Sequence, residues 1–582
     1  MTSHPLTYIV YSMRKKALLC LLILSFSCIA VSFAQPPASQ QMSGEERQRE
    51  LEAQDKALIQ KIEQPKEKPQ VKEELPPIPP PIQSKEKVAV KTINVLGVTL
   101  IKDSEIRAIV APYENTEVTI DQLQEAANKI TDVYRSKGYI TSRAYLPPQK
   151  IAVGAVEIRV LEGAMGSIEV KGNKWFKSRL ILRRITLKKG EPFNYNTLRQ
   201  NLININDVPD RAAKAVLVPG KEPGTTDVVL EVKDRLPIHA GFTWDDFGSR
   251  YIGGQRYLVQ FTDNNLLGFD DKLTFQYQLA QSSRYFLKNI RYLFPISGNT
   301  EIGAFASLSR IKLGKEFEDL DARGKSQVYS LFADSKVFDT ENFDISLSGG
   351  FDYKNITNIQ EGAVTSEDRL RIVKGGFNID QSDNYGRTLL TYELDYGIPG
   401  IMGGLKTEST TSSRNGAGGK FVKNTVNLLR LQKLPFSSSL LWKNSLQFSP
   451  YILTAAEEFQ LGGIVNVRGY PPAEVVGDSG AAMTWEWSTP FYFIPKNMKF
   501  PFSKAKAYDA LRFVTFYDWG DVHLRRPLAS EEKSKTLRSV GCGMRINLPE
   551  DFSLRLEFAW ALDQTPSDGD RQHTWAQVSK TF

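Results

Sequence analysis

The chain has 582 residues, of which 41% are hydrophobic, 24% charged and 10% aromatic, and its formal net charge is +8. This mild charge over so long a chain gives no reason to expect a nucleic-acid partner. Its mean hydropathy is negative, and a polar average combined with many aromatic residues favours alternating β-strands over apolar helices. The length leaves room for several domains.

Residues 1–34 are typical of a secretory signal peptide. Basic residues at 14–16 precede an apolar run, and Ala34 ends a small-residue cleavage site. Met13 is an alternative start, while a signal anchor or a lipoprotein site at Cys28 are the other interpretations. The expected mature chain keeps only Cys542 and so forms no internal disulfide. No later run reaches about 18 apolar residues, so no transmembrane helix is predicted.

Residues 35–63 are expected to hold a helix, and residues 64–87 a linker. Ser43 and Glu46 have capping-box spacing, which places the start of the helix at Ser43. The helix has few apolar residues, so it is solvated, lies in a polar lumen or binds a periplasmic partner. The linker contains "ELPPIPPPIQ", and such proline density favours an extended, polyproline-like spacer.

Residues 88–163 and 164–235 look like a weak internal duplication. "KTINVLGVTL" and "GSIEVKGNKW" share the pattern Ile-x-Val-x-Gly, and "VEIRVLEG" resembles "VVLEVKDR" at a similar offset of about 75 positions. Each unit predicts the order strand, helix, helix, strand, strand, which is enough for a small α+β domain. Two unrelated α+β modules are the alternative.

From residue 236 to residue 582, apolar and polar residues alternate. Leu273, Phe275, Tyr277 and Leu279 share one face, and several later segments repeat this pattern. A soluble sandwich would alternate too, but the segment is too long for one, and aromatic residues recur near strand ends as in interfacial girdles. An antiparallel transmembrane β-barrel is therefore predicted, closed because lipid tolerates no unpaired edge. About 22 residues per strand and connection give roughly 16 strands.

Two motifs in the predicted barrel carry a family resemblance. "VRGY" at 467–470 is followed by "FYDWGDV" at 516–522, and "GDSGAAMTWEWSTP" at 477–490 lies between them. With these motifs the chain resembles the TpsB transporters of two-partner secretion, the ShlB/FhaC/HecB family. The resemblance covers nearly all of the mature chain: plug helix, proline linker, two POTRA-like repeats and barrel. The motif residues are Val467, Arg468, Gly469 and Tyr470 in a loop, and Phe516, Asp518 and Gly520 on the barrel wall.

The resemblance implies an outer-membrane translocase with periplasmic N-terminal domains. It would recognise an unfolded exoprotein, such as an adhesin, haemolysin, haem-scavenging protein or contact-inhibition toxin, and secrete it through the barrel. The implied surroundings are outer-membrane lipid and lipopolysaccharide, around a monomer that needs no cofactor and no nucleic acid. An assembly or insertion factor, or a passive pore, is the alternative, although two repeats rather than several favour export.

The resemblance also implies that the VRGY loop folds into the lumen and that Arg468 pairs with Asp518. Strand parity puts Phe516, Asp518 and Gly520 on one face, and Gly520 would leave space beside the carboxylate. A guanidinium can hold such a carboxylate through two hydrogen bonds. Together with the helix, this pair would keep the pore closed. A solvated Arg468 in a mobile loop is the alternative.

Other motifs do not support an enzyme. "GDSG" at 477–480 resembles a protease nucleophile loop, but no histidine has a matching base context. "NGAGGK" at 415–420 has Arg414 where a phosphate-binding loop needs its first glycine. Histidine and cysteine are too scattered for a zinc site. Asp245 and Asp246 are expected to be solvated charges rather than calcium ligands, so neither a catalytic nor a metal site is predicted.

Overall fold

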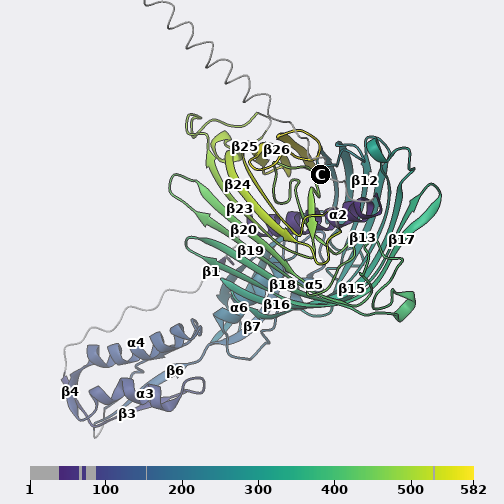
Figure 1. The fold of residues 1–582 in the computed structure, drawn as a ribbon. Coiled ribbons are helices and arrows are strands. Elements are labelled where there is room, and N and C mark those ends of the chain that lie inside the picture. The colour runs from purple at the N-terminus through teal and green to yellow at the C-terminus, as the bar shows by residue number, and fades with distance from the viewer. Residues whose placement is uncertain (1–37, 64–68, 74–86, 152–153, 502, 529–530) are drawn as a thin grey trace, which may run out of the picture.

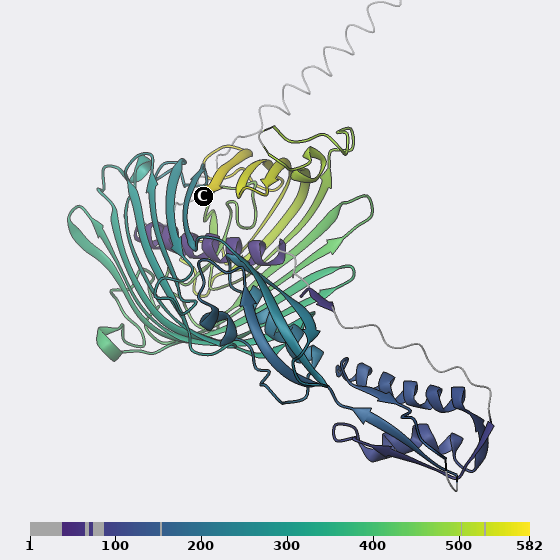
Figure 2. The same ribbon diagram turned by 180° about the vertical axis from the view of Figure 1, so that it is seen from behind.

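The protein is described by a computed structural model that covers residues 38–63, 69–73, 87–151, 154–501, 503–528 and 531–582. The expected signal peptide and Cys28 lie outside these residues. Figures 1 and 2 show a helix enclosed by a large barrel, with two small α+β domains extending from one end of the barrel. The prediction of a mainly β chain with a 16-stranded barrel is confirmed.

Helix α2 (Ala38–Glu63) lies inside the barrel (Figure 1). Met42 near its start packs against wall residues Tyr285 and Ile311, and Ile62 near its end packs in a separate cluster at the other end of the lumen. The predicted start at Ser43 is wrong, because the helix already begins at Ala38. The preceding residues Ala-Ser-Gln-Gln-Met contain good helix formers, which extend the helix beyond the capping-box pattern.

Part of the linker forms a strand. β1 (Val71–Glu73) pairs in parallel with β8 (Arg211–Pro219), with Val71 opposite Ala215. The prediction of a purely extended spacer over 64–87 is therefore wrong for these residues. They precede the proline cluster and keep their backbone donors, so they can add to a sheet edge. The proline cluster itself lies outside the described residues.

The first α+β domain follows the predicted order, with a small additional strand pair. Its sheet has the order β3-β6-β5, and β2 pairs with β4. The Thr119 hydroxyl accepts a hydrogen bond from the Gln122 backbone N–H, and the Thr119 backbone N–H donates to Gln122 Oε1. This capping box begins α4. The elements are β2 (Lys87–Val90), β3 (Thr92–Leu96), α3 (Asp103–Val110), η1 (Ala111–Tyr113), β4 (Thr116–Thr119), α4 (Ile120–Ser136), β5 (Arg143–Tyr145) and β6 (Ala155–Leu161).

The second α+β domain has a four-stranded sheet in the order β1-β8-β9-β7. Gly97 and Gly172 occupy the repeated glycine position of the two units, with φ of 87° and 88°. Only glycine adopts this left-handed backbone freely, so the duplicated motif marks the same turn in both domains. The elements are β7 (Ala164–Lys171), α5 (Ser178–Leu182), α6 (Tyr195–Asn206), β8 and β9 (Thr225–Asp234).

A carboxylate ties the first domain together. Glu162 Oε1 accepts hydrogen bonds from the Thr99 backbone at 2.7 Å, the Leu100 backbone at 2.9 Å and the Tyr134 hydroxyl at 2.6 Å. Burial alone would raise the pKa of the Glu162 carboxyl, but the hydrogen bonds outweigh it and hold the pKa below its ordinary value of 4.5. A carboxyl group whose pKa is lower in the folded state than in the unfolded state stabilises the fold at pH values above its unfolded-state pKa. This stabilisation is lost as the pH falls through the folded-state pKa.

We therefore expect amide protection factors at Thr99 and Leu100 to fall when the pH is lowered from 7 to below the folded-state pKa of Glu162. Glu162→Gln should lower protection at pH 7 and remove most of this pH dependence. Hydrogen exchange of the full chain, corrected for intrinsic rates, measures both effects. Glu125→Gln is the matched control, because Glu125 pairs only with exposed Lys129 at 2.8 Å on α4. Equal pH profiles for Glu162→Gln and the unmodified chain would contradict this.

Within the described residues, sixteen antiparallel strands close into a barrel, because β10 pairs with β27 through Gly241 opposite Thr581. Side chains alternate between lumen and outer surface along each strand. The strands are β10 (Ile238–Asp245), β11 (Arg256–Asp263), β12 (Lys272–Ala280), β13 (Tyr285–Pro295), β14 (Thr300–Lys312), β15 (Arg323–Asp339), β16 (Phe343–Gln360), β17 (Ala363–Asp383), β18 (Gly386–Gly397), β19 (Phe421–Lys433), β20 (Ser439–Phe448), β23 (Ser479–Pro490), β24 (Leu511–His523), β25 (Ser534–Leu548), β26 (Phe552–Ala561) and β27 (Gln572–Thr581).

The second α+β domain is attached to one end of the barrel. Arg211 Nη1 lies 2.7 Å from Asp270 Oδ1 in the turn between β11 and β12, and both side chains are fully buried. Arg184 binds the same carboxylate at 3.0 Å. Because the strands are antiparallel, the connections 434–438, 491–510 and 549–551 lie at this same, domain-bearing end. Connections 398–420 and 449–478 lie at the opposite end.

No helix in the described residues is both long and apolar enough to cross a bilayer.

Candidate functional site

The loop between β20 and β23, residues 449–478, folds back into the barrel. It contains the short strands β21 (Phe459–Leu461) and β22 (Val475–Gly477), which pair with each other. Residues 453–464 and 466–470 are buried. Phe459, Leu461, Val467 and Tyr470 pack in one apolar cluster with wall residues such as Val522. The loop is therefore a folded part of the interior.

Arg468 meets Asp518 inside the barrel. Arg468 Nη2 lies 2.8 Å from Asp518 Oδ1, Nε lies 3.0 Å from Oδ2, and the Arg468 backbone N–H donates to Oδ2 at 3.1 Å. The guanidinium carbon stands 3.3 Å from the centre of the Phe516 ring, which suits a cation–π contact. Trp575 Nε1 donates to the Arg468 carbonyl at 2.8 Å. The VRGY loop and the wall motif thus meet at the Arg468–Asp518 ion pair, in which the guanidinium donates two hydrogen bonds to the carboxylate.

The same guanidinium also binds two glutamates. Arg468 Nη1 lies 2.9 Å from Glu486 Oε2 and 3.0 Å from Glu557 Oε2. Arg545 bridges these glutamates, and Arg555 binds Glu557 at 2.6 Å. Positive and negative side chains therefore balance in this group, which we name the lock cluster. It consists of Arg468, Arg545, Arg555, Asp518, Glu486 and Glu557. Arg468 and the three carboxylates are buried, and Arg545 and Arg555 are half-buried.

Two motif glycines allow the loop to approach the wall. A Cβ on Gly520 would lie 2.5 Å from Leu461 Cδ2 of the loop. A Cβ on Gly469 would lie 2.7 Å from the backbone N of Ala561 and the Cβ of Ser539. Real Cβ atoms do not approach so closely, so both positions require glycine in this packed arrangement.

A second arginine fixes the ends of the loop. Arg414 Nη1 lies 2.6 Å from Asp478 Oδ1 and 2.8 Å from Glu458 Oε1. Asp478 also accepts from the backbone N–H groups of Leu453 and Arg525, each at 2.7 Å. The aspartate of "GDSG" and the arginine that precedes "NGAGGK" thus hold together the connections 398–420 and 449–478. Both connections lie at the end of the barrel opposite the α+β domains. Sequence reasoning did not find this pair.

The loop and α2 share binding groups on the wall. Lys354 Nζ lies 2.8 Å from Glu50 of α2 and 2.8 Å from Glu457 of the loop. Gln460 Nε2 donates to the Gly44 carbonyl of α2 at 2.9 Å. Lys443 binds Asp55 of α2 at 2.7 Å and also donates to a loop carbonyl, that of Val465. If either the helix or the loop is displaced, Lys354 and Lys443 each lose one of these two contacts.

The expectation of a solvated side chain is wrong for Asp245, while Asp246 is half-buried. Asp245 is buried, and its Oδ1 lies 2.5 Å from Arg256 Nε. Arg256 in turn binds Glu52 of α2 at 2.9 Å. Asp246 Oδ1 accepts from the Ala576 backbone at 2.7 Å. Glu52 of the helix in the lumen thus lies beside this strand end and completes its charge network. Within the described residues, no group of three or more His, Cys, Asp or Glu is arranged to hold a metal ion.

Comparison with known proteins decides the family. Residues 88–163 match the POTRA domain, ShlB-type, and residues 224–546 match the haemolysin secretion/activation protein ShlB/FhaC/HecB. The chain belongs to the ShlB/FhaC/HecB family. Its POTRA domain and barrel are thus those of a two-partner secretion transporter of the bacterial outer membrane, which acts with a secreted exoprotein partner.

Individual relatives support the same assignment over most of the chain. The heme/hemopexin transporter protein HuxB of Haemophilus influenzae is 27% identical over 492 residues, which cover 82% of this chain and 84% of the relative. The outer membrane transporter CdiB of Dickeya dadantii is 24% identical over 67% of this chain and 71% of the relative. The structure of CdiB from Escherichia coli shares the fold, with a TM-score of 0.73 and 21% identity over 92% of this chain and 98% of that structure.

Proposed function

We propose that α2 and the lock cluster together close this transporter at rest, and that secretion requires both to move. Lys354 carries the argument, because its ammonium bridges Glu50 of the helix and Glu457 of the loop at 2.8 Å each. An extended chain cannot pass while a helix about 10–12 Å across lies in the lumen. Arg468 and Asp518 act here as the lock between loop and wall.

The chain is divided, in this proposal, into a signal peptide (1–34), a plug helix (35–63), a linker (64–87), two POTRA domains (88–163 and 164–235) and the barrel (236–582). The linker then tethers the plug while it is outside the lumen. Supporting this, β1 lies within the linker and holds the tether beside the second POTRA domain through β8.

The exoprotein is recognised, in this proposal, by strand addition to a POTRA sheet. An unfolded segment has unpaired N–H and C=O groups that an edge strand can bind. β1 and β7 are the edges of the four-stranded sheet. At rest β1 covers β8, so a client segment that adds to β8 has to replace β1.

The barrel is proposed to act as a monomer surrounded by outer-membrane lipid and lipopolysaccharide. Pairing of β10 with β27 leaves no barrel edge for a second copy. Large apolar side chains are exposed on the outer wall, among them Leu331 at 67%, as expected where the surroundings are acyl chains rather than water.

Deletion of the gene tests the function. We expect one large exoprotein to disappear from the culture medium, while the amounts of other outer-membrane barrels stay unchanged. The unmodified gene and a Lys420→Met variant, altered at an exposed loop position, should restore secretion. Loss of many barrels would instead indicate an assembly factor. An unchanged set of secreted proteins with reduced solute uptake would indicate a passive pore.

A further inference from the structure

One connection at the domain-bearing end of the barrel is unlike the others. The connection between β23 and β24 spans residues 491–510, and its described residues, 491–501 and 503–510, are folded where transmembrane barrels usually have a short turn. Lys499 and Lys506 pair as an isolated antiparallel bridge, and a helical turn, α7 (Ala507–Ala510), leads into β24. Ser503 donates to Glu550 of the adjacent turn at 2.7 Å. The segment therefore has a defined shape.

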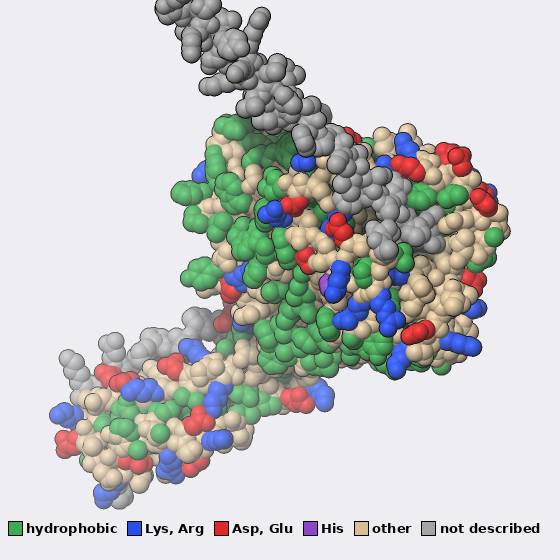
Figure 3. Space-filling model, viewed as in Figure 1, with side chains coloured by type: hydrophobic (Ala, Val, Ile, Leu, Met, Phe, Trp, Pro, Cys, Tyr) green, Lys and Arg blue, Asp and Glu red, His purple; other side chains and the backbone are tan. Residues whose placement is uncertain are grey.

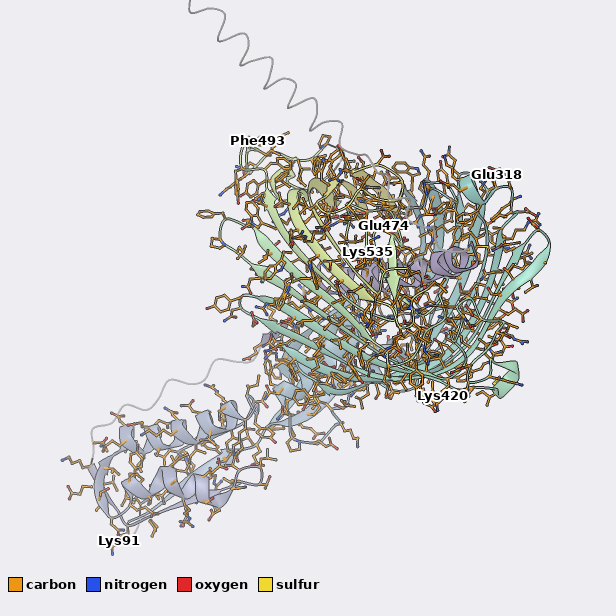
Figure 4. The ribbon with its side chains drawn as sticks, viewed as in Figure 1. Lys91, Glu318, Lys420, Glu474, Phe493 and Lys535 are labelled. Atoms are coloured by element: carbon orange, nitrogen blue, oxygen red, sulfur yellow. The ribbon has the colours of Figure 1, made fainter. Side chains whose placement is uncertain are left out.

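This 491–510 segment exposes large apolar side chains. Phe493 is 80% exposed, and Phe436 of the neighbouring turn is 82% exposed. The Tyr492 hydroxyl donates to the Phe436 carbonyl at 3.3 Å, which joins the two connections. Met498 is exposed as well. Figure 3 shows hydrophobic side chains gathered on that side of the barrel, and Figure 4 labels Phe493 there.

The patch continues onto the outer wall of the barrel. Glu486 on β23 and Asp518 on β24 point into the lumen, and side chains alternate along a strand. Trp487 on β23 and Phe513 on β24 are an odd number of residues away from them, so they point outward. Phe491 packs edge-on against Phe513 with ring centres 5.8 Å apart. The aromatic surface thus runs without a break from the lipid-facing wall to the exposed connection, on the side of the wall that a client in the lumen cannot reach.

Exposed lysines occur in the same segment as the apolar side chains. Four of them lie in the segment, and Asp509 is its one acidic residue among those described. Two copies related by a twofold axis would place these lysines opposite one another, which disfavours self-association. Aromatic rings with lysines beside them suit a bilayer interface, where the rings enter the headgroup layer and the ammonium groups reach phosphates. The lysines are Lys496, Lys499, Lys504 and Lys506.

We propose that the 491–510 segment is a membrane anchor that inserts into the periplasmic leaflet and binds anionic phospholipid headgroups. It joins the two strands that carry Glu486 and Asp518 of the lock cluster. Anchoring this connection in lipid holds that pair of strands in place while the loop and α2 leave the lumen. Lipid binding by this segment rests on the outer-membrane location alone, whereas its role during opening rests on the proposed function.

Quenching by spin-labelled lipids tests the anchor. The chain without residues 1–34, and so without Cys20 and Cys28, carries Cys542→Ala and receives one cysteine at Phe493. It is labelled with a fluorophore and reconstituted into vesicles. Leu331→Cys on the outer wall is the lipid-facing control, and Lys91→Cys on the first POTRA domain (Figure 4) is the water-facing control. We expect nitroxide lipids to quench the label at 493 nearly as strongly as at 331. Quenching no stronger than at 91 would overturn the proposal.

A second measurement tests headgroup charge. At equal mole fraction, nitroxide phosphatidylglycerol should quench the label at 493 about two- to threefold more than nitroxide phosphatidylcholine, because lysines near the surface attract anionic lipid. Replacing the four lysines by glutamine should bring this ratio to about one. Equal quenching in the chain that keeps its lysines would overturn the anionic preference. Quenching that disappears on dilution of the protein in lipid would show contact between copies instead.

Discussion

Replacing Arg468 by methionine is expected to release the 449–478 loop from the barrel wall. The substitution leaves Asp518, Glu486 and Glu557 with only two arginines, Arg545 and Arg555, and so leaves one buried carboxylate without a compensating charge. Removing one partner of a buried pair costs roughly 3–5 kcal/mol. Since about 1.4 kcal/mol corresponds to a factor of ten, protection of the loop from hydrogen exchange should fall about 140- to 3,700-fold.

Hydrogen exchange of the purified full chain measures this effect in residues 461–470. Arg468→Lys is an informative second variant, because lysine keeps the charge but cannot reach Asp518, Glu486 and Glu557 with one planar fork. Its protection should lie between those of the unmodified chain and the methionine variant. Lys420→Met, at an exposed position of the 398–420 connection, should change nothing. Unchanged protection in Arg468→Met would mean that apolar packing alone holds the loop.

The expected Arg468–Asp518 pairing followed from two short motifs, whereas the glutamates around it did not. Asp518 and Phe516 share a face by simple parity on one strand. Glu486 and Glu557 belong to β23 and β26, and their height in the barrel depends on the stagger between strands. A local sequence pattern contains no information on that stagger. An inward-facing glutamate on an alternating strand was the available signal, but many strands carry such a residue.

The errors in the sequence prediction also have physical causes. Asp245 looked solvated because it ends a strand, yet α2 lies over it and Glu52 completes its charge network through Arg256. Where a helix lies in a lumen depends on contacts with several strands distant in sequence. In the same way, Val71–Glu73 looked like spacer, because pairing with β8 depends on where the second α+β domain lies. Alternation over 236–582, by contrast, is a local property, and it predicted the barrel.

Deleting residues 35–63 is expected to raise the conductance of the transporter in a planar bilayer severalfold. α2 occupies the lumen and is held by Glu50, Glu52 and Asp55, which bind wall residues Lys354, Arg256 and Lys443. Removal replaces a helix about 10–12 Å across with water, so ions gain a wider path. The loop stays bound through Arg468, and for this reason the open current should remain below that of an empty 16-stranded barrel.

Variants that weaken the contacts of α2 show whether the raised current of the deletion comes from loss of the plug or from damage to the barrel. Glu50→Ala with Asp55→Ala should leave the fully open current equal to that of the deletion, while the channel spends only part of its time open. Gln54→Ala with Gln60→Ala is the matched control, because both side chains are exposed on α2 and alanine preserves the helix. This control should keep the low resting current. If the deletion left the current unchanged, the loop alone would close the pore, and Lys354 would connect two elements of which only one acts as a gate.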